Sequence, residues 1–148
     1  MNAKKNVSRL PLLVLPALIL CGAVAFFMFK RMEGVPPTVT LGLASSALGA
    51  NQTIDLTVAD AKSGIRRAWV GLLKDGQEIV LLDKTFASAG IFTGGVVHEE
   101  KLRIPFEPQS KGIKDGKAML RVMVRDYSWR QWGDGNAAYQ EQEVMIDT

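Results

Sequence analysis

The side chains that most often carry enzyme chemistry are almost absent from this sequence. His98 is the one histidine and Cys21 the one cysteine among 148 residues. A zinc site of the usual composition needs more such ligands than one chain offers. A serine triad would have to use His98, and no serine has the G-x-S-x-G context of a nucleophile elbow. The sequence therefore predicts no catalytic residue, no metal ligand and no cofactor, and we expect the chain not to be an enzyme. His98 itself is expected to be a solvated residue at the start of a strand.

Two aspartate-containing segments could still offer the oxygen ligands that calcium prefers. They are Asp60–Gly64 and Asp126–Ser128, with Asp134 or Asn136 close to the second. The same spacing of aspartate, serine and glycine also forms Asx turns, which close the ends of strands. Positive side chains in both regions would oppose a cation, namely Lys62 and Arg130. Asx turns are the favoured interpretation, and calcium is the alternative.

The region from Asp126 to Asn136 also concentrates aromatic residues. The candidate interaction surface consists of Tyr127, Trp129, Arg130 and Trp132. These rings could stack on a sugar or hold a peptide. Strand alternation predicts that Asp126 and Ser128 point inward and that Tyr127 and Trp129 point outward. Packing on a neighbouring loop is favoured for these aromatics, ahead of contact with a partner or domain and ahead of ligand binding.

An apolar segment near the amino terminus precedes all of these candidate residues. Leu10–Phe29 contains no charge, and as a helix it would be about 30 Å long, enough to cross a bilayer core. Basic residues before it favour a cytoplasmic amino terminus. The predicted order is a basic cytoplasmic segment (1–9), a transmembrane signal anchor (10–29), a proline-containing linker (30–37) and an exported β-domain (38–148).

Two alternatives compete with a retained anchor. Ala23-Val-Ala25 fits a signal-peptidase site, and cleavage near Ala25 would release a secreted subunit. Against cleavage, the apolar run continues through Phe29 and ends on positive charge. Cys21 could be acylated in a lipoprotein, but Leu20 stands where a small residue is required. We therefore favour the anchor, with Cys21 as an apolar residue of its helix.

The net charge of +3 does not indicate a nucleic-acid partner. Residues 1–33 carry five basic residues and one acidic residue, whereas residues 34–148 carry thirteen basic and fourteen acidic residues. Binding to a phosphate backbone needs a basic face on the folded domain. The exported domain is nearly neutral, so we expect it not to bind nucleic acid.

Residues 38–148 alternate between apolar and polar side chains with the period of half-buried strands. Lys74–Gln77 is typical of a two-residue hairpin turn. About seven short strands predict an all-β fold, an immunoglobulin-like β-sandwich. Trp69 is expected in its core, and Ile79–Leu82 is expected to be a strand buried on both faces. The alternating residues are Ile54, Leu56 and Val58; Leu102, Ile104 and Phe106; Leu120, Val122 and Val124; and Val144 and Ile146.

Four segments together resemble the amino-terminal region of membrane-anchored murein metallopeptidases of the lysostaphin or LytM type. They are Val35–Thr40, Asp60–Ile65, Asp126–Asn136 and Val144–Thr148. In that family an anchor and a β-sandwich region precede a zinc endopeptidase domain that cuts peptidoglycan cross-links. The H-x-x-x-D and H-x-H motifs that bind the zinc are absent here, so no catalytic or metal-binding residue carries over.

From these observations we expect a single-pass protein of the bacterial inner membrane whose β-domain is periplasmic or extracellular. Its expected role is that of an anchor, spacer or interaction module associated with peptidoglycan remodelling. The expected partners are the lipid bilayer through residues 10–29, an envelope protein or neighbouring domain, and peptidoglycan. One alternative is the amino-terminal fragment of a zinc murein endopeptidase, and another is a secreted subunit of an extracellular assembly.

Overall fold

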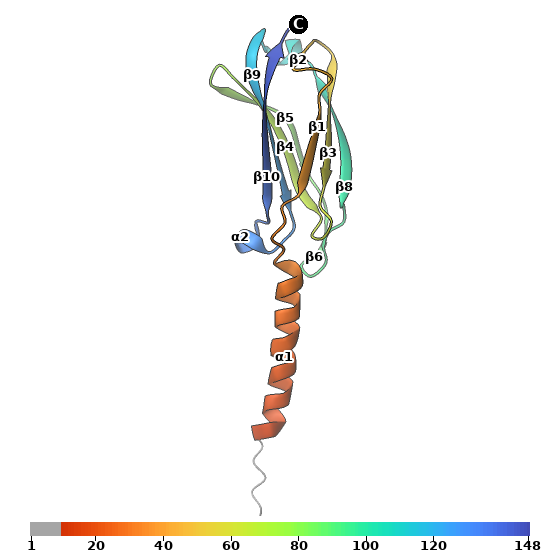
Figure 1. The fold of residues 1–148 in the computed structure, drawn as a ribbon, viewed down its shortest axis with the longest axis vertical. Helices are drawn as coiled ribbons and strands as arrows, with labels where there is room; N and C mark the ends of the chain where they lie inside the picture. The colour runs from red at the N-terminus through yellow and green to blue at the C-terminus, as the bar shows by residue number, and fades with distance from the viewer. Residues whose placement is uncertain (1–9) are drawn as a thin grey trace, which may run out of the picture.

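Two β-sheets face one another at the end of a single long helix (Figure 1). The computed structural model describes residues 10–148. Helix α1 (Leu10–Arg31) has 22 residues and is therefore about 33 Å long. The part from Leu13 to Arg31, with a mean hydropathy of 2.2, is long and apolar enough to span a membrane. The apolar helix and the mostly β remainder that the sequence predicts are thus confirmed.

The strands form two main sheets and one short hairpin. The first sheet has the order β1 (Thr38–Gly42), β3 (Gln52–Ala59), β8 (Glu99–Phe106). The second has the order β2 (Ala47–Leu48), β10 (Ala137–Ile146), β9 (Gly116–Asp126), β4 (Ile65–Lys74), β5 (Gln77–Thr85). The hairpin pairs β6 (Ser88–Gly90) with β7 (Gly94–Gly95). A 3₁₀ turn, η1 (Gln109–Lys111), precedes β9, and a single helical turn, α2 (Arg130–Gly133), precedes β10.

The core lies between the two main sheets and is built from alternate residues of each strand. Ile54, Leu56 and Val58 of β3 are each at most 1 % exposed and face the second sheet. The corresponding residues of β9, β8 and β10 are buried in the same core: Leu120, Val122, Val124, Leu102, Ile104, Phe106, Val144 and Ile146. Every period-two segment predicted from the sequence is therefore a strand with the predicted inward face.

The turn between β4 and β5 also agrees with its sequence signature. Lys74 pairs with Gln77, and the two residues between them have positive φ, 51° at Asp75 and 78° at Gly76. An Asp-Gly pair is suited to this backbone because glycine carries no Cβ and aspartate tolerates the left-handed region.

Three expectations about the sandwich need correction. Trp69 is half-buried on the outer face of the second sheet, because its strand neighbours Ala68 and Val70 take the inward positions. Ile79–Leu82 is not buried on both faces, and Val80 is 48 % exposed. The reason is that Val80 pairs with Gly71 on the outer face of the second sheet, which is open to solvent. Residues 10–148 contain ten strands, eight of them in the two facing sheets, instead of about seven.

Candidate functional site

The chain that leaves α1 enters the sandwich at once. Arg31 is only 4 % exposed, and its guanidinium Nη2 donates a hydrogen bond to the carbonyl of Tyr127. The backbone N–H of Trp129 donates to the Arg31 carbonyl over 2.9 Å. The end of the helix is thus held at two points by the loop after β9. The helix continues two residues beyond the predicted boundary at 29, so part of the expected linker 30–37 is helical.

Glu33 extends this docking with both its side chain and its backbone. Glu33 is 7 % exposed, and its carboxylate accepts a hydrogen bond from Ser63 Oγ at 2.9 Å. Its carbonyl accepts from Arg130 Nε at 3.1 Å and from the side-chain amide of Asn136 at 2.9 Å. Ser63 lies between β3 and β4, and Arg130 and Asn136 lie between β9 and β10. The segment from Arg31 to Glu33 is therefore attached to two loops at the near end of the sandwich.

Asp126 organises the second of these loops. Its Oδ1 accepts hydrogen bonds from the Ser128 N–H (2.9 Å), the Ser128 hydroxyl (2.7 Å) and the Asn136 N–H (2.7 Å). Its Oδ2 accepts from the Asn136 amide at 2.9 Å. Asp126 and Ser128 are buried, so their predicted inward orientation is confirmed. Hydrogen bonds of this kind compensate the cost of burying a carboxylate.

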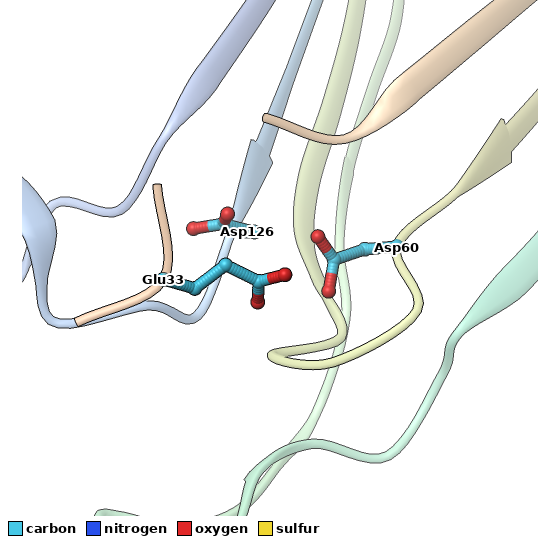
Figure 2. Close-up of side chains that lie close together, drawn as sticks. All are labelled: Glu33, Asp60 and Asp126. Atoms are coloured by element: carbon cyan, nitrogen blue, oxygen red, sulfur yellow. The ribbon is translucent and has the colours of Figure 1, made fainter. Parts of the chain in front are cut away.

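Three carboxylates converge where the helix meets the sandwich. Figure 2 shows Glu33, Asp60 and Asp126 on three separate segments, with the Glu33 carboxylate extended toward Asp60. One oxygen of each lies within 4.8 Å of the others, and all three residues are buried. Asp60 Oδ1 accepts from the N–H groups of Lys62 (3.2 Å) and Gly64 (2.6 Å), which confirms the Asx turn. Carboxylate oxygens are the ligands that Ca²⁺ prefers, but hydrogen bonds occupy Glu33 Oε2 and both Asp126 oxygens, and Ca²⁺ takes six to eight ligands.

Sequence reasoning considered Asp60 and Asp126 as calcium ligands but missed Glu33. No spacing signal connects Glu33 to either aspartate, because the contact depends on where the helix ends. Of the two further ligands considered, Asn136 lies at the cluster, where its amide bonds to Asp126 and to the Glu33 carbonyl. Asp134 lies elsewhere; its side chain is 71 % exposed and is 3.9 Å from Arg66. His98 is exposed immediately before β8, as predicted, with Nδ1 2.8 Å from the Asp60 carbonyl.

Two of the four predicted interaction residues pack against the β6–β7 hairpin and against Phe86, two residues before it. The Tyr127 hydroxyl donates to the carbonyl of Phe86 at 2.6 Å. The indole Nε1 of Trp129 donates to the carbonyl of Ile91 at 3.1 Å. The Trp129 ring centroid is 6.1 Å from that of Phe92, at the tip of the hairpin. Both Tyr127 and Trp129 are half-buried by these contacts.

The other two predicted residues lie on α2 and are exposed. Arg130 combines an exposed side chain with the hydrogen bond to Glu33 described above. Trp132 has its whole side chain in solvent, with an exposed fraction of 105 %. Gln131 and Trp132 have φ values of 49° and 60°, a left-handed conformation that is rare for bulky residues. The structure thus brings all four residues to the helix-proximal end of the sandwich, where Figure 1 shows α2.

A second candidate surface lies on the outer face of the five-stranded sheet, and the sequence did not predict it. Trp69 of β4 is paired with Met123 of β9, which is paired with Tyr139 of β10. The Trp69 ring covers Gly71, two residues further along the same strand face. Tyr139 is 68 % exposed. These residues line an open depression of about 680 Å³.

Ion pairs surround this apolar row. Arg67 donates hydrogen bonds of 2.8 and 2.6 Å to Asp83, which raise the pKa of Arg67 and lower the pKa of Asp83. Arg121 donates to Glu141 and to Glu78, each over 2.9 Å, and these bonds raise the pKa of Arg121. Because folding lowers the Asp83 pKa, its pair stabilises the fold above the unfolded-state pKa and is lost as the pH falls through the folded-state pKa. At the solvent surface such pairs contribute little to stability.

Comparison with known proteins gives only distant structural likenesses. No family model matches the chain, and no curated protein matches it. The sporulation control protein Spo0M from Bacillus subtilis has 16 % identity and a TM-score of 0.43, over 77 % of this chain and 50 % of that one. The sulfur carrier protein SoxY from Chlorobium limicola f thiosulfatophilum has 13 % identity and a TM-score of 0.37, over 89 % and 99 %. An engineered protein has 12 % identity and a TM-score of 0.40, over 76 % of this chain and 20 % of that one.

Proposed function

We propose that the chain is a single-pass protein of the bacterial inner membrane whose β-sandwich is a periplasmic or extracellular interaction module. The observation that carries the proposal is the uncovered apolar surface of α1. Leu18 is 63 % exposed, and Ile19 and Leu20 are each 66 % exposed. Such a surface is unfavourable in water and stable when lipid surrounds it. The basic residues before the helix support a cytoplasmic amino terminus.

The junction supports a fixed orientation of the sandwich on the membrane. A flexible tether needs a solvated linker that is free to change conformation. Arg31 and Glu33 are instead buried, and their carbonyls accept hydrogen bonds from the loop between β9 and β10. In this proposal the helix and the sandwich move as one body.

The strand order supports an immunoglobulin-like topology for the sandwich. If β2 is treated as a continuation of the first strand and β6–β7 as an insertion, β1, β3 and β8 correspond to strands A, B and E. On the same basis β4, β5, β9 and β10 correspond to C, C′, F and G. The observed orders, β1-β3-β8 and β10-β9-β4-β5, are then those of the two layers of this fold.

We propose the Trp69–Met123–Tyr139 row as the surface that binds an envelope protein. The three residues form an apolar row, with Trp69 and Met123 half-buried and Tyr139 exposed, and charged side chains surround it. This is the composition of a binding patch at a protein interface. Aromatic residues at such positions often carry a large share of the binding energy.

A thiol-to-amine crosslinker that does not cross the inner membrane tests this function in cells whose outer membrane is permeabilised and whose cell wall is intact. All variants carry Cys21→Ser, and Glu141→Cys places the reporter beside the row without altering it. We expect crosslinking from outside, reduced at least about fivefold by Tyr139→Ser, because truncating an interface aromatic costs about 1 kcal/mol or more. Arg103→Cys is the matched control, since Arg103 is 86 % exposed on the other sheet, and it should give no product. Equal amounts of product from both reporters would contradict the assignment of the row as the binding surface. Reaction only after lysis would contradict the location of the sandwich outside the inner membrane.

Peptidoglycan is the second candidate partner for the same surface. The Trp69 ring covers Gly71 on an open face, and such a ring offers a platform on which a sugar can stack. The resemblance to the anchor region of murein metallopeptidases also supports this candidate, together with a role in peptidoglycan remodelling. The crosslinking experiment separates the two, because a protein partner gives a discrete band whereas peptidoglycan gives material that muramidase digestion releases.

A further inference from the structure

The tip of the β6–β7 hairpin lies beside the end of the apolar helix. The ring centroid of Phe92, at this tip, is 5.2 Å from that of Phe27 in α1. On its other side Phe92 approaches Trp129, whose indole bonds to the Ile91 carbonyl. Figure 1 shows the hairpin reaching down to the level at which α1 enters the sandwich. The tip is therefore held against the helix and does not project freely.

The depth of this contact along α1 places the tip inside the apolar segment. Phe27 precedes Arg31, the last helical residue, by four positions, which correspond to about 6 Å along the axis. Phe29, 89 % exposed, is still nearer to the sandwich than Phe27. If lipid surrounds the apolar part of α1, it also reaches the side chain that packs on Phe27.

The exposed side chains at this end of the sandwich are those suited to a lipid–water boundary. Ile91 is 70 % exposed and Phe92 is 57 % exposed, although both are strongly apolar. Trp132 is completely exposed on α2, at the same end of the molecule. Tryptophan is enriched at membrane interfaces, where its ring is apolar and its N–H can meet water. Lys30, exposed at the end of the helix, adds a positive charge where lipid phosphates lie.

The close approach of two turns makes this position of the hairpin possible. Gly64 has φ of 78°, and a Cβ placed on it would lie 2.8 Å from the Cα of Gly95 in β7. The Gly95 N–H donates to the Ser63 carbonyl at 2.7 Å. The hairpin is thus fixed to the same turn that binds Glu33, so the tip, the helix end and the sandwich form one unit.

We propose that Ile91 and Phe92, together with Trp132, insert into the outer interface of the lipid bilayer and form a second membrane contact beside α1. This inference rests on the proposal that α1 spans the membrane. With two attachments the sandwich can neither rise from the bilayer nor tilt freely, and the outer face of the five-stranded sheet is held at a constant angle to the membrane. The partner at this end is therefore lipid.

The collisional relaxation of spin labels by oxygen and by an aqueous nickel complex measures this insertion. The experiment uses the full chain in vesicles of phosphatidylethanolamine and phosphatidylglycerol. Each variant carries Cys21→Ser and one labelled cysteine. Ile91→Cys reports the hairpin tip and leaves Phe92 in place. Gln109→Cys reports the exposed turn η1, at the end of the sandwich away from α1, and Leu18→Cys reports the middle of the helix.

We expect the labels at 91 and 18 to be protected from an aqueous nickel complex and relaxed by oxygen, and the label at 109 to show the reverse. Phe92→Ser should return the label at 91 toward water. Protection at 18 combined with full aqueous access at 91 would overturn the inference and leave the membrane anchor intact. Aqueous access at both 18 and 91 would overturn the anchor and the inference with it.

Discussion

Replacing Asn136 with alanine is expected to lower the free energy of unfolding by about 3 kcal/mol. Hydrogen bonds to charged groups contribute about 1.5–3 kcal/mol, and the buried Asp126 Oδ2, left without its donor, adds to the loss. The Asn136 side-chain amide lies 2.9 Å from both Asp126 Oδ2 and the Glu33 carbonyl. It is therefore the one amide in the described structure that joins the segment after α1 directly to the buried carboxylate of the β9–β10 loop. Without it, the buried Asp126 carboxyl group loses the donor to its Oδ2. Urea unfolding of the full chain in mild detergent, followed by tryptophan fluorescence, measures the change.

Asp134→Ala is the matched control for this substitution. Asp134 lies in the same loop, its side chain is 71 % exposed, and its contact with Arg66 is 3.9 Å. Its loss should change the free energy of unfolding by no more than about 0.5 kcal/mol, as is usual for surface positions. Equal effects of Asn136→Ala and Asp134→Ala would show that the junction does not contribute to stability as the structure indicates.

Replacing Gly64 with alanine should destabilise the sandwich by about 3 kcal/mol. A positive φ alone costs an alanine about 1–2 kcal/mol. The remainder reflects the close contact between Gly64 and Gly95 of β7. The new Cβ would lie 2.8 Å from Gly95 Cα and 2.9 Å from the Gly95 carbonyl oxygen. Backbone atoms cannot rotate away as a side chain can, so the β6–β7 hairpin must move. The Tyr127 N–H, which donates to the Gly64 carbonyl at 2.9 Å, would move with it.

Gly76 provides the control, because its φ of 78° equals that of Gly64 and nothing lies within 4 Å of a Cβ placed there. Gly76→Ala should therefore show the backbone penalty alone, about 1–2 kcal/mol. The same urea titration compares the two variants. If Gly64→Ala costs no more than Gly76→Ala, the close contact between the turn and the hairpin does not constrain the protein.

The sandwich could be predicted because the alternation of apolar and polar residues within each strand indicates which face points into the core. Ile54, Leu56 and Val58 alternate with polar residues, and a period of two leaves one choice of core face. Trp69 was misplaced for a related reason. Its strand contains apolar residues on both faces, and the larger side chain was assigned to the core although Ala68 and Val70 occupy it. The Trp69–Met123–Tyr139 row on the outer sheet face was therefore not predicted.

The junction could be predicted only in part, because its contacts join residues far apart in the sequence. Asp126 and Ser128 were assigned inward positions from strand alternation, and Asp60 was assigned to an Asx turn; the structure shows both features. Nothing in the local sequence indicates that Glu33 meets them, or that Arg31 is buried at the end of an apolar helix. These contacts follow from the direction in which α1 enters the sandwich, which is a property of the assembled fold.

The distance between two spin labels, one on the helix and one on the sandwich, tests most directly whether the junction makes them a single body. Leu20→Cys and Gln109→Cys, with Cys21→Ser, place the labels on exposed positions at either side of the junction. Pulsed dipolar spectroscopy on the full chain in vesicles should give one narrow distance distribution, which broadens in Asn136→Ala. A broad distribution in the chain with the unaltered junction would contradict the account, because it would mean that the sandwich is tethered to the membrane and not held against it.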